Sequence, residues 1–290
     1  MSRTATRDRF QPGTRVGDYR VDGELGSEDA GIIYAGTHVV LPRKAAIKVM
    51  HASSQYLKSI AVQMLREACL LEAMSHPGVP RVYECGVLPD KRPWSAFERI
   101  DGVTVGAILS AGPLPLVDVV LIMRDVADLL CHVHARGVVH RGLTADAIVR
   151  TPERAFGICV RHWDEAHTLD TEARVAIDAR DDVHALGVIA FRALTGTLPD
   201  QSVSTAERCA GAPTELTSLV DHMLATEPIA RPTSHEVRDR ARWLAATLEP
   251  MTTPRAFFSG PPGGSQPDAL PSGDDLSGFS VRISRTRTSG

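Results

Sequence analysis

Several features are scarce in this sequence of 290 residues, and each absence excludes a class of protein. No apolar run approaches the roughly 20 residues that a membrane-spanning helix needs, so no membrane span is expected. The five cysteines are scattered without a C-x-x-C pair, which argues against a disulfide framework or zinc site and favours the cytoplasm. The net charge of -3 excludes a globally basic nucleic-acid-binding protein.

Lysine is also scarce, whereas apolar residues are plentiful. The chain has four Lys among 32 basic residues, so a Lys that falls inside a motif is less easily explained by chance. Hydrophobic residues make up 43% of the chain, which is enough to form a core.

The order of sequence patterns indicates a domain with two lobes. Short apolar runs separated by turns favour strands from residue 19 to about residue 100, and one amphipathic helix is expected over about 58–75. From residue 116 onward, amphipathic helices dominate. We therefore predict a flexible N-terminus over 1–17, a β-rich lobe over 18–98 and a helical lobe over 102–247. The Pro, Gly and Ser content after residue 250 predicts a disordered tail over 248–290.

Four segments carry a resemblance to a known family. They are LGSEDAGIIYAG at 25–36, AAIK ending in Lys48, LREACLLEAMSHPGV around Glu67, and CHVHARGVVHRGLTADAIV at 131–149. In this order they resemble the motifs of bacterial Ser/Thr protein kinases, over roughly residues 19–247. The resemblance implies an α+β, bilobal protein-kinase-like fold, with a small β-rich N-lobe that contains one helix and a larger helical C-lobe.

The same resemblance implies a nucleotide-binding cleft. Lys48 would hold the phosphates of ATP and pair with Glu67, while Phe97 would lie at the back of the pocket. The full set of residues expected to bind the cofactor is Leu25, Gly26, Gly31, Ile33, Ala46, Lys48, Glu67 and Glu98.

Several positions depart from the family's pattern. Gly142 replaces the Asp that accepts the substrate proton, Thr144 replaces the loop Lys, and Ala147 replaces the Asn that binds Mg²⁺. His162 falls at the position of the family's metal-binding Asp, and Glu28 replaces the middle Gly of the phosphate loop. We therefore assign no catalytic residue and no metal site. We expect weak ATP binding at most and assign no role to Mg²⁺.

Carboxylates in shifted positions leave an alternative open. Asp146, Asp164 or Glu165 could substitute for the missing groups, and a slip of two residues would move Asp164 into the metal position. That slip would disturb the alternation of Ile158 and Val160 in the expected strand.

Other positions that match the family belong to its scaffold. Asp182 matches the Asp that braces the loop containing His140 and Arg141, and Trp163 matches an apolar residue packed against the helix of Glu67. Arg231 matches the structural Arg, whose only counterpart here would be Glu172 in a shortened activation segment.

Three functions follow as hypotheses. The first is a pseudokinase that acts through other signalling proteins or kinases, because losing a positioned base costs about 10²–10⁴ in rate. The second is a low-activity or unorthodox Ser/Thr kinase that uses shifted carboxylates. The third is a nucleotide sensor without turnover.

Overall fold

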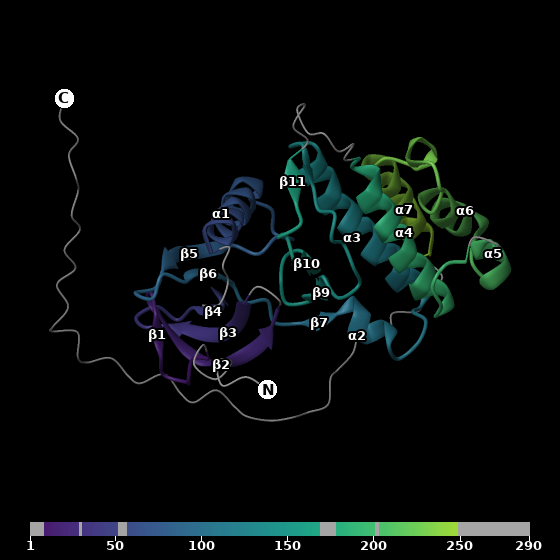
Figure 1. Ribbon diagram of the computed structural model, residues 1–290. Coiled ribbons are helices and arrows are strands. Elements are labelled where there is room, and N and C mark those ends of the chain that lie inside the picture. The colour runs from purple at the N-terminus through teal and green to yellow at the C-terminus, as the bar shows by residue number, and fades with distance from the viewer. Residues whose placement is uncertain (1–8, 29–30, 52–56, 169–177, 201–202, 249–290) are drawn as a thin grey trace, which may run out of the picture. The chain divides into compact units, whose positions relative to one another are not determined.

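Two lobes make up the structure, a computed structural model that describes residues 9–28, 31–51, 57–168, 178–200 and 203–248. A sheet with one helix forms the N-lobe, and helices dominate the C-lobe (Figure 1). The predicted α+β, bilobal fold is therefore confirmed. None of the helices in these described ranges is long and apolar enough to cross a membrane.

The N-lobe contains a six-stranded antiparallel sheet in the order β1-β2-β3-β4-β6-β5. Its strands are β1 (Arg15–Val16), β2 (Tyr19–Ser27), β3 (Gly31–His38), β4 (Lys44–Met50), β5 (Val82–Val87) and β6 (Pro93–Glu98). Side chains alternate between the two faces of a strand. In β4, Ala45, Ile47 and Val49 are buried in the N-lobe core, so Ala46 and Lys48 face the other side, toward the C-lobe.

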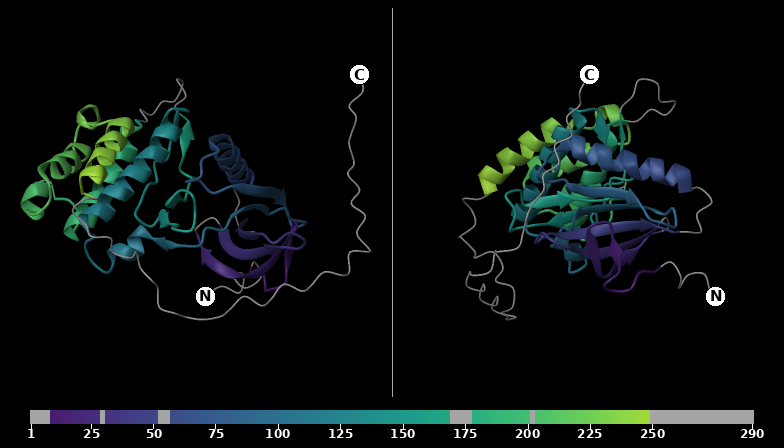
Figure 2. Two further views of the ribbon diagram at one scale, coloured as in Figure 1. Left: turned by 180° about the vertical axis from the view of Figure 1, so that it is seen from behind. Right: turned by 90° about the vertical axis from the view of Figure 1, so that its left-hand side faces the viewer.

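Helix α1 (Leu57–Met74) lies across the sheet next to β5 and β6 (Figure 2). Its bounds agree with the helix predicted over about 58–75. Its buried residues Leu70, Leu71 and Met74 belong to the same apolar cluster as the C-lobe core. The helix that carries Glu67 is thus packed against both lobes.

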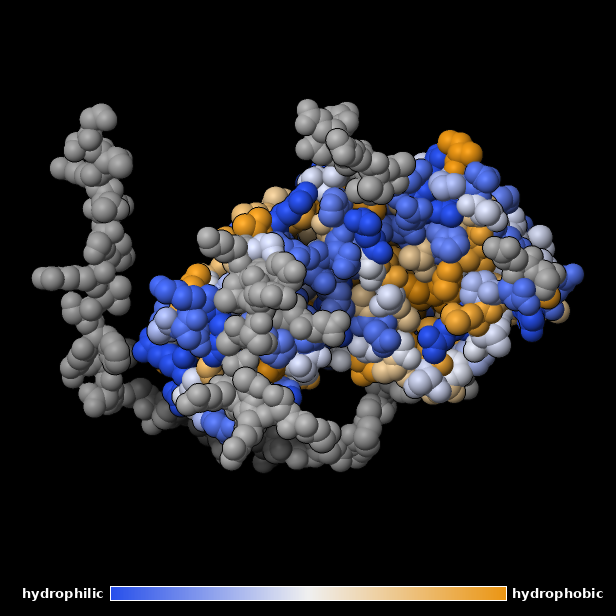
Figure 3. Space-filling view, viewed as in Figure 1, coloured by the Kyte–Doolittle hydropathy of each residue, from blue (hydrophilic) through white to orange (hydrophobic). Residues whose placement is uncertain are grey.

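The C-lobe is built around α3, which contacts α4 and α7. Its helices are α2 (Val105–Leu109), α3 (Leu116–His134), α4 (Arg180–Thr195), α5 (Thr205–Arg208), α6 (Thr214–Met223), the 3-10 helix η1 (Pro228–Ala230) and α7 (Ser234–Leu248). Helix α4 ends at Gly196, whose φ of 76° is the left-handed conformation that glycine adopts without strain. Hydrophobic residues gather near α4 on a face that is otherwise largely hydrophilic (Figure 3).

Short strand pairs hold the loops between the lobes. The strands are β7 (Val103–Thr104), β8 (Val138–Val139), β9 (Ile148–Arg150), β10 (Ile158–Val160) and β11 (His167–Thr168). Strand β8 pairs with β11, and β9 pairs with β10. These two pairings bring the loop after residue 139 beside the loop after residue 160, where the altered motif positions lie.

The ends of the chain were predicted to be flexible. Of the predicted flexible segment 1–17, residues from Phe10 onward pack on the sheet, where the backbone N–H of Phe10 donates to the Tyr34 hydroxyl at 3.0 Å and Val16 in β1 is fully buried. A segment this short carries little periodicity, so the sequence did not predict the contact between Phe10 and Tyr34. Apart from Leu248, which ends α7, the predicted tail 248–290 lies outside the described residues, as does Glu172.

Candidate functional site

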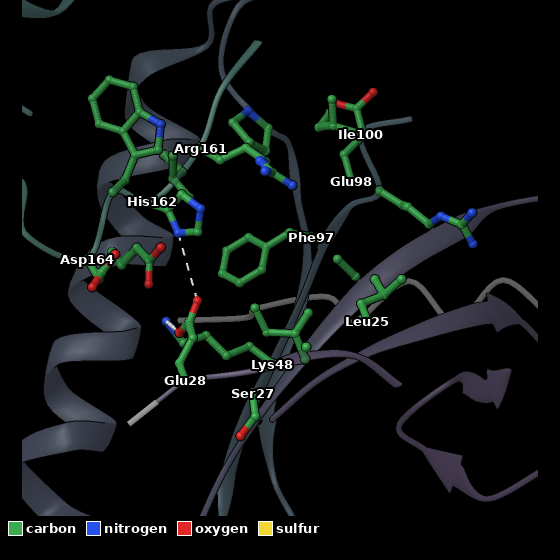
Figure 4. A pocket seen from close by; sticks show the side chains of 18 residues that line it. Leu25, Ser27, Glu28, Lys48, Phe97, Glu98, Ile100, Arg161, His162 and Asp164 are labelled. Atoms are coloured by element: carbon green, nitrogen blue, oxygen red, sulfur yellow. Dashed lines mark ion pairs between the residues drawn. The ribbon is translucent and has the colours of Figure 1, made fainter. Parts of the chain in front are cut away.

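A cleft of about 360 Å³ lies between the two lobes and brings together most of the predicted cofactor-binding residues (Figure 4). Its volume is in the range of small-molecule sites. The predicted residues that line it are Leu25, Gly26, Ile33, Ala46, Lys48, Glu67 and Glu98, together with Phe97. One predicted residue, Gly31, is not part of this lining.

Gly31 has a structural reason to be glycine. A Cβ at this position would lie 2.4 Å from the backbone oxygen of Val49, so β3 and β4 could not keep their spacing. Packing gives no such reason for the glycine at position 26, since nothing lies within 4 Å of a Cβ built on Gly26. The two glycines that carried the resemblance therefore differ, one being required by strand packing and the other only lining the cleft.

Lys48 is held by Glu28 rather than by the predicted partner. Its Nζ lies 2.9 Å from Glu28 Oε2, and the other carboxylate oxygen of Glu28 lies 3.8 Å from His162 Nδ1. Among the ion pairs of the described residues, none joins Lys48 to Glu67. The predicted Lys48–Glu67 ion pair is therefore wrong. Glu28, which replaces the middle Gly of the phosphate loop, reaches the ammonium group of Lys48 instead.

The carboxyl groups of Glu28, Glu67 and Asp164 share the cleft with the Lys48 ammonium group. Burial alone would lower the pKa of Lys48, but the charges of Glu67 and Glu28 outweigh burial and raise it. Burial raises the pKa of Glu67 to about 7, Lys48 only partly opposes this, and Asp164 and Glu28 add to it. Near neutral pH, Glu67 is thus protonated in a substantial fraction of molecules.

The altered motif positions lack the groups that the family uses. Gly142 is beside the cleft, and a Cβ built there would contact only Glu165 and the His162 backbone, at 3.6–3.8 Å. Ala147 is fully buried. Thr144 is exposed and its hydroxyl accepts the N–H of Ala147 at 3.2 Å, so it closes a turn. His162 points into the cleft (Figure 4).

The three possible substitutes lie in different places. Asp146 is turned away toward α2, where it accepts a hydrogen bond from the Thr104 hydroxyl at 3.3 Å. Its assignment as a substitute is therefore wrong, because its side chain is engaged outside the cleft. Asp164 lines the cleft beside Lys48, and Glu165 lies next to Gly142.

The loops that bear these residues are firmly held. Asp182 is buried and accepts the backbone N–H groups of His140 and Arg141, each at 2.8 Å, as predicted. The His140 ring lies tilted against the Trp163 ring, with the ring centres 4.4 Å apart. Trp163 is buried in one apolar cluster with Leu70 of α1, as predicted. The scaffold around the altered positions is therefore intact.

Two side-chain contacts, one in the cleft and one in the C-lobe, were not predicted from the sequence. Arg161 lines the cleft and donates to the backbone oxygen of Asp146 at 3.2 Å, but it belongs to no motif that could have marked it. Arg231 pairs with Asp181 at 2.8 Å, a neighbour that no spacing rule singled out.

A bound Mg²⁺ does not fit the residues present. Gly142 and Ala147 offer no side-chain donor, and the imidazole of His162 is a poor ligand for an ion that prefers hard oxygen donors. Across the described part of the chain, no group of three or more His, Cys, Asp and Glu side chains is placed to hold a metal ion.

Comparison with known proteins agrees with this architecture. The family "Protein tyrosine and serine/threonine kinase" matches residues 19–161. The serine/threonine-protein kinase Pkn1 of Myxococcus xanthus is 30% identical over 210 residues, which cover 64% of this chain and 30% of that protein. Kinase pkn2 of the same organism is 28% identical, covering 87% of this chain and 36% of that protein. The chain thus spans about a third of the length of these relatives.

A solved structure gives the same fold. The kinase domain of PknI from Mycobacterium tuberculosis superimposes with a TM-score of 0.64 at 23% identity, covering 82% of this chain and all of that one. The motif order, the two lobes, the cleft and these relatives lead to one conclusion: the chain contains a domain of the protein kinase family, with bacterial Ser/Thr kinases as its homologues.

Proposed function

We propose that this domain is a catalytically impaired kinase-like protein, a pseudokinase that acts in signalling by binding other proteins. One observation carries the proposal: Gly142 and Ala147 stand at the positions where the family has a base and a metal ligand, and Lys48 in the cleft is bound to Glu28. ATP could bind weakly, without turnover.

The magnitudes support impairment. A positioned general base contributes about 10²–10⁴ in rate, and phosphoryl transfer further depends on metal ions that neutralise charge. Such losses are not additive. Even one loss of about 10³ would reduce a kinase of about 1–100 turnovers per second to a negligible rate.

The intact scaffold supports a role in binding. Asp182 still braces the loop at His140, and Trp163 still packs with α1, although the groups for chemistry have been replaced. A fold held rigid in this way can present a constant surface to a partner. We therefore propose other signalling proteins or kinases as its partners.

A phosphotransfer assay tests the proposal. Wild type, Lys48→Ala and the double variant Gly142→Asp/His162→Asp would be incubated with labelled ATP, Mg²⁺ or Mn²⁺, and a generic protein substrate. We expect no transfer by wild type above the level of Lys48→Ala. Transfer by wild type that disappears in Lys48→Ala would defeat the proposal, whereas a gain in the double variant alone would support it.

A low-activity kinase is the second candidate, favoured by the positions of two carboxylates. Asp164 lines the cleft beside Lys48, and Glu165 lies next to Gly142, where the family's base would be. This candidate expects Mn²⁺ to bind with nucleotide and the signal to fall in Asp164→Asn. Electron paramagnetic resonance would measure this, with Asp146→Asn as the control because its side chain lies at α2.

A further inference from the structure

The tip of the β2–β3 hairpin places a carboxylate inside the cleft. The backbone N–H of Glu28 donates to the oxygen of Gly31 at 2.8 Å, and the N–H of Gly31 donates back at 3.3 Å, which closes the hairpin. The Glu28 side chain then extends between the lobes, to Lys48 on β4 at 2.9 Å and to His162 after β10 at 3.8 Å (Figure 4). It thus contacts groups from both lobes at once.

This carboxylate occupies the place that an anionic ligand would need. Lys48 is the cation that faces the cleft from β4, and Glu28 already neutralises it. Glu67 and Asp164 line the same space, so an incoming polyphosphate would meet three acidic side chains around one ammonium group. Like charges that share one cleft repel one another.

Of the other basic side chains that line the cleft, Arg99 pairs with Asp101 at 3.0 Å, whereas the Arg161 guanidinium keeps its charge, because its partner at 3.2 Å is the neutral backbone oxygen of Asp146. His162 is the third basic group, and burial lowers the pKa of its imidazole, so it is largely neutral near pH 7. A phosphate group would have to displace Glu28 in order to reach Lys48.

The cleft also has apolar walls that suit a flat, uncharged ring. They are formed by the side chains of Leu25, Ile33, Ala46, Leu71 and Phe97. Their edge is the segment after β6. Among the described residues, no turn or loop hydrogen bond uses the backbone groups of Arg99 or Ile100, so these groups remain available to a heteroaromatic ligand.

From this contrast we propose that the cleft binds an uncharged nucleoside in preference to a nucleoside triphosphate, because the Glu28 carboxylate takes the place of phosphate on Lys48. The inference rests on the proposed function in that a site which transfers no phosphate has no need to bind one. The Glu28 carboxylate thus determines which class of ligand the cleft binds.

Calorimetric titration of the full chain with adenosine and with ATP, in the absence of divalent metal, tests the proposal. Wild type is expected to bind adenosine more tightly than ATP by about tenfold or more. Glu28→Gln keeps the size of the side chain and removes its charge, so it is expected to tighten ATP binding by about tenfold and to change adenosine binding by less than about threefold.

Glu24→Gln is the matched control. It removes the same charge from the same hairpin, but Glu24 pairs with Arg9 outside the cleft, so both affinities are expected to stay at the wild-type values. The proposal is overturned if wild type prefers ATP, if it binds neither ligand at millimolar concentration, or if Glu28→Gln leaves ATP binding unchanged. ATP preference without phosphotransfer would overturn this proposal alone, whereas phosphotransfer that depends on Lys48 would overturn the proposed function.

Discussion

The partly buried carboxyl of Glu67 makes the stability of the domain depend on pH in a direction that can be measured. Its pKa rises from 4.5 to about 7 on folding, mainly through burial. Each pKa unit corresponds to about 1.4 kcal/mol, so the ionised carboxylate costs the folded state about 3 kcal/mol. Because the folded state holds this proton more tightly than the unfolded state, the contribution to stability is greatest below pH 4.5 and declines as the pH rises to about 7.

Glu67→Gln removes the titrating group and keeps its size. Most of the penalty, about 2 kcal/mol, falls between about pH 5 and about pH 8. We therefore expect the variant to gain about 2 kcal/mol relative to wild type on going from the lower to the higher pH, measured by urea unfolding with tryptophan fluorescence.

Two comparisons make this result specific. Glu72→Gln changes an exposed carboxylate on the same helix and is expected to show no such change. Burial also lowers the pKa of His76 to about 4, which makes stability fall as the pH decreases, so only the difference between variant and wild type is diagnostic. A difference that is the same at both pH values would refute the reasoning.

Three further predictions concern the scaffold. Asp182→Ala should cost about 3 kcal/mol or more in urea unfolding because buried N–H groups lose their acceptor, whereas Asp181→Ala, which removes a half-exposed ion pair, should cost under about 1 kcal/mol. Gly31→Ala should lower stability by about 1–3 kcal/mol because its Cβ meets the β4 backbone, and an equal effect of Gly26→Ala, which meets nothing, would contradict this account. Burial raises the pKa of Cys159 to about 12, so a thiol reagent should modify exposed Cys69 in the native protein and reach Cys159 only after unfolding. Loss of the Cys159 thiol before unfolding would contradict this prediction.

The fold was largely predictable because its signals are local or belong to ordered motifs. Helix α1, for example, agrees with the helix that its apolar spacing predicts over about 58–75. Packing of the N-terminal residues was not predictable, because the segment around Phe10, which contacts Tyr34, carries no pattern of its own.

The site was predictable as a set of positions but not as a set of contacts. The motif order placed Lys48, Glu67 and Glu98 in one cleft, and the structure brings them together. Which carboxylate reaches Lys48 depends on side-chain direction and hairpin geometry, and sequence spacing cannot choose between Glu28 and Glu67. Likewise, Asp146 and Asp164 are both acidic residues near the altered motifs, but only the fold turns one outward and the other inward.

The open space at Gly142 has a consequence for how such a domain can change over time. Its nearest non-neighbouring atoms would be 3.6–3.8 Å from a new Cβ, and its backbone does not require glycine. A Cβ could therefore be added at this position by substitution while the neighbouring loops keep their places. The loop can thus gain or lose a side chain here without a change in its backbone.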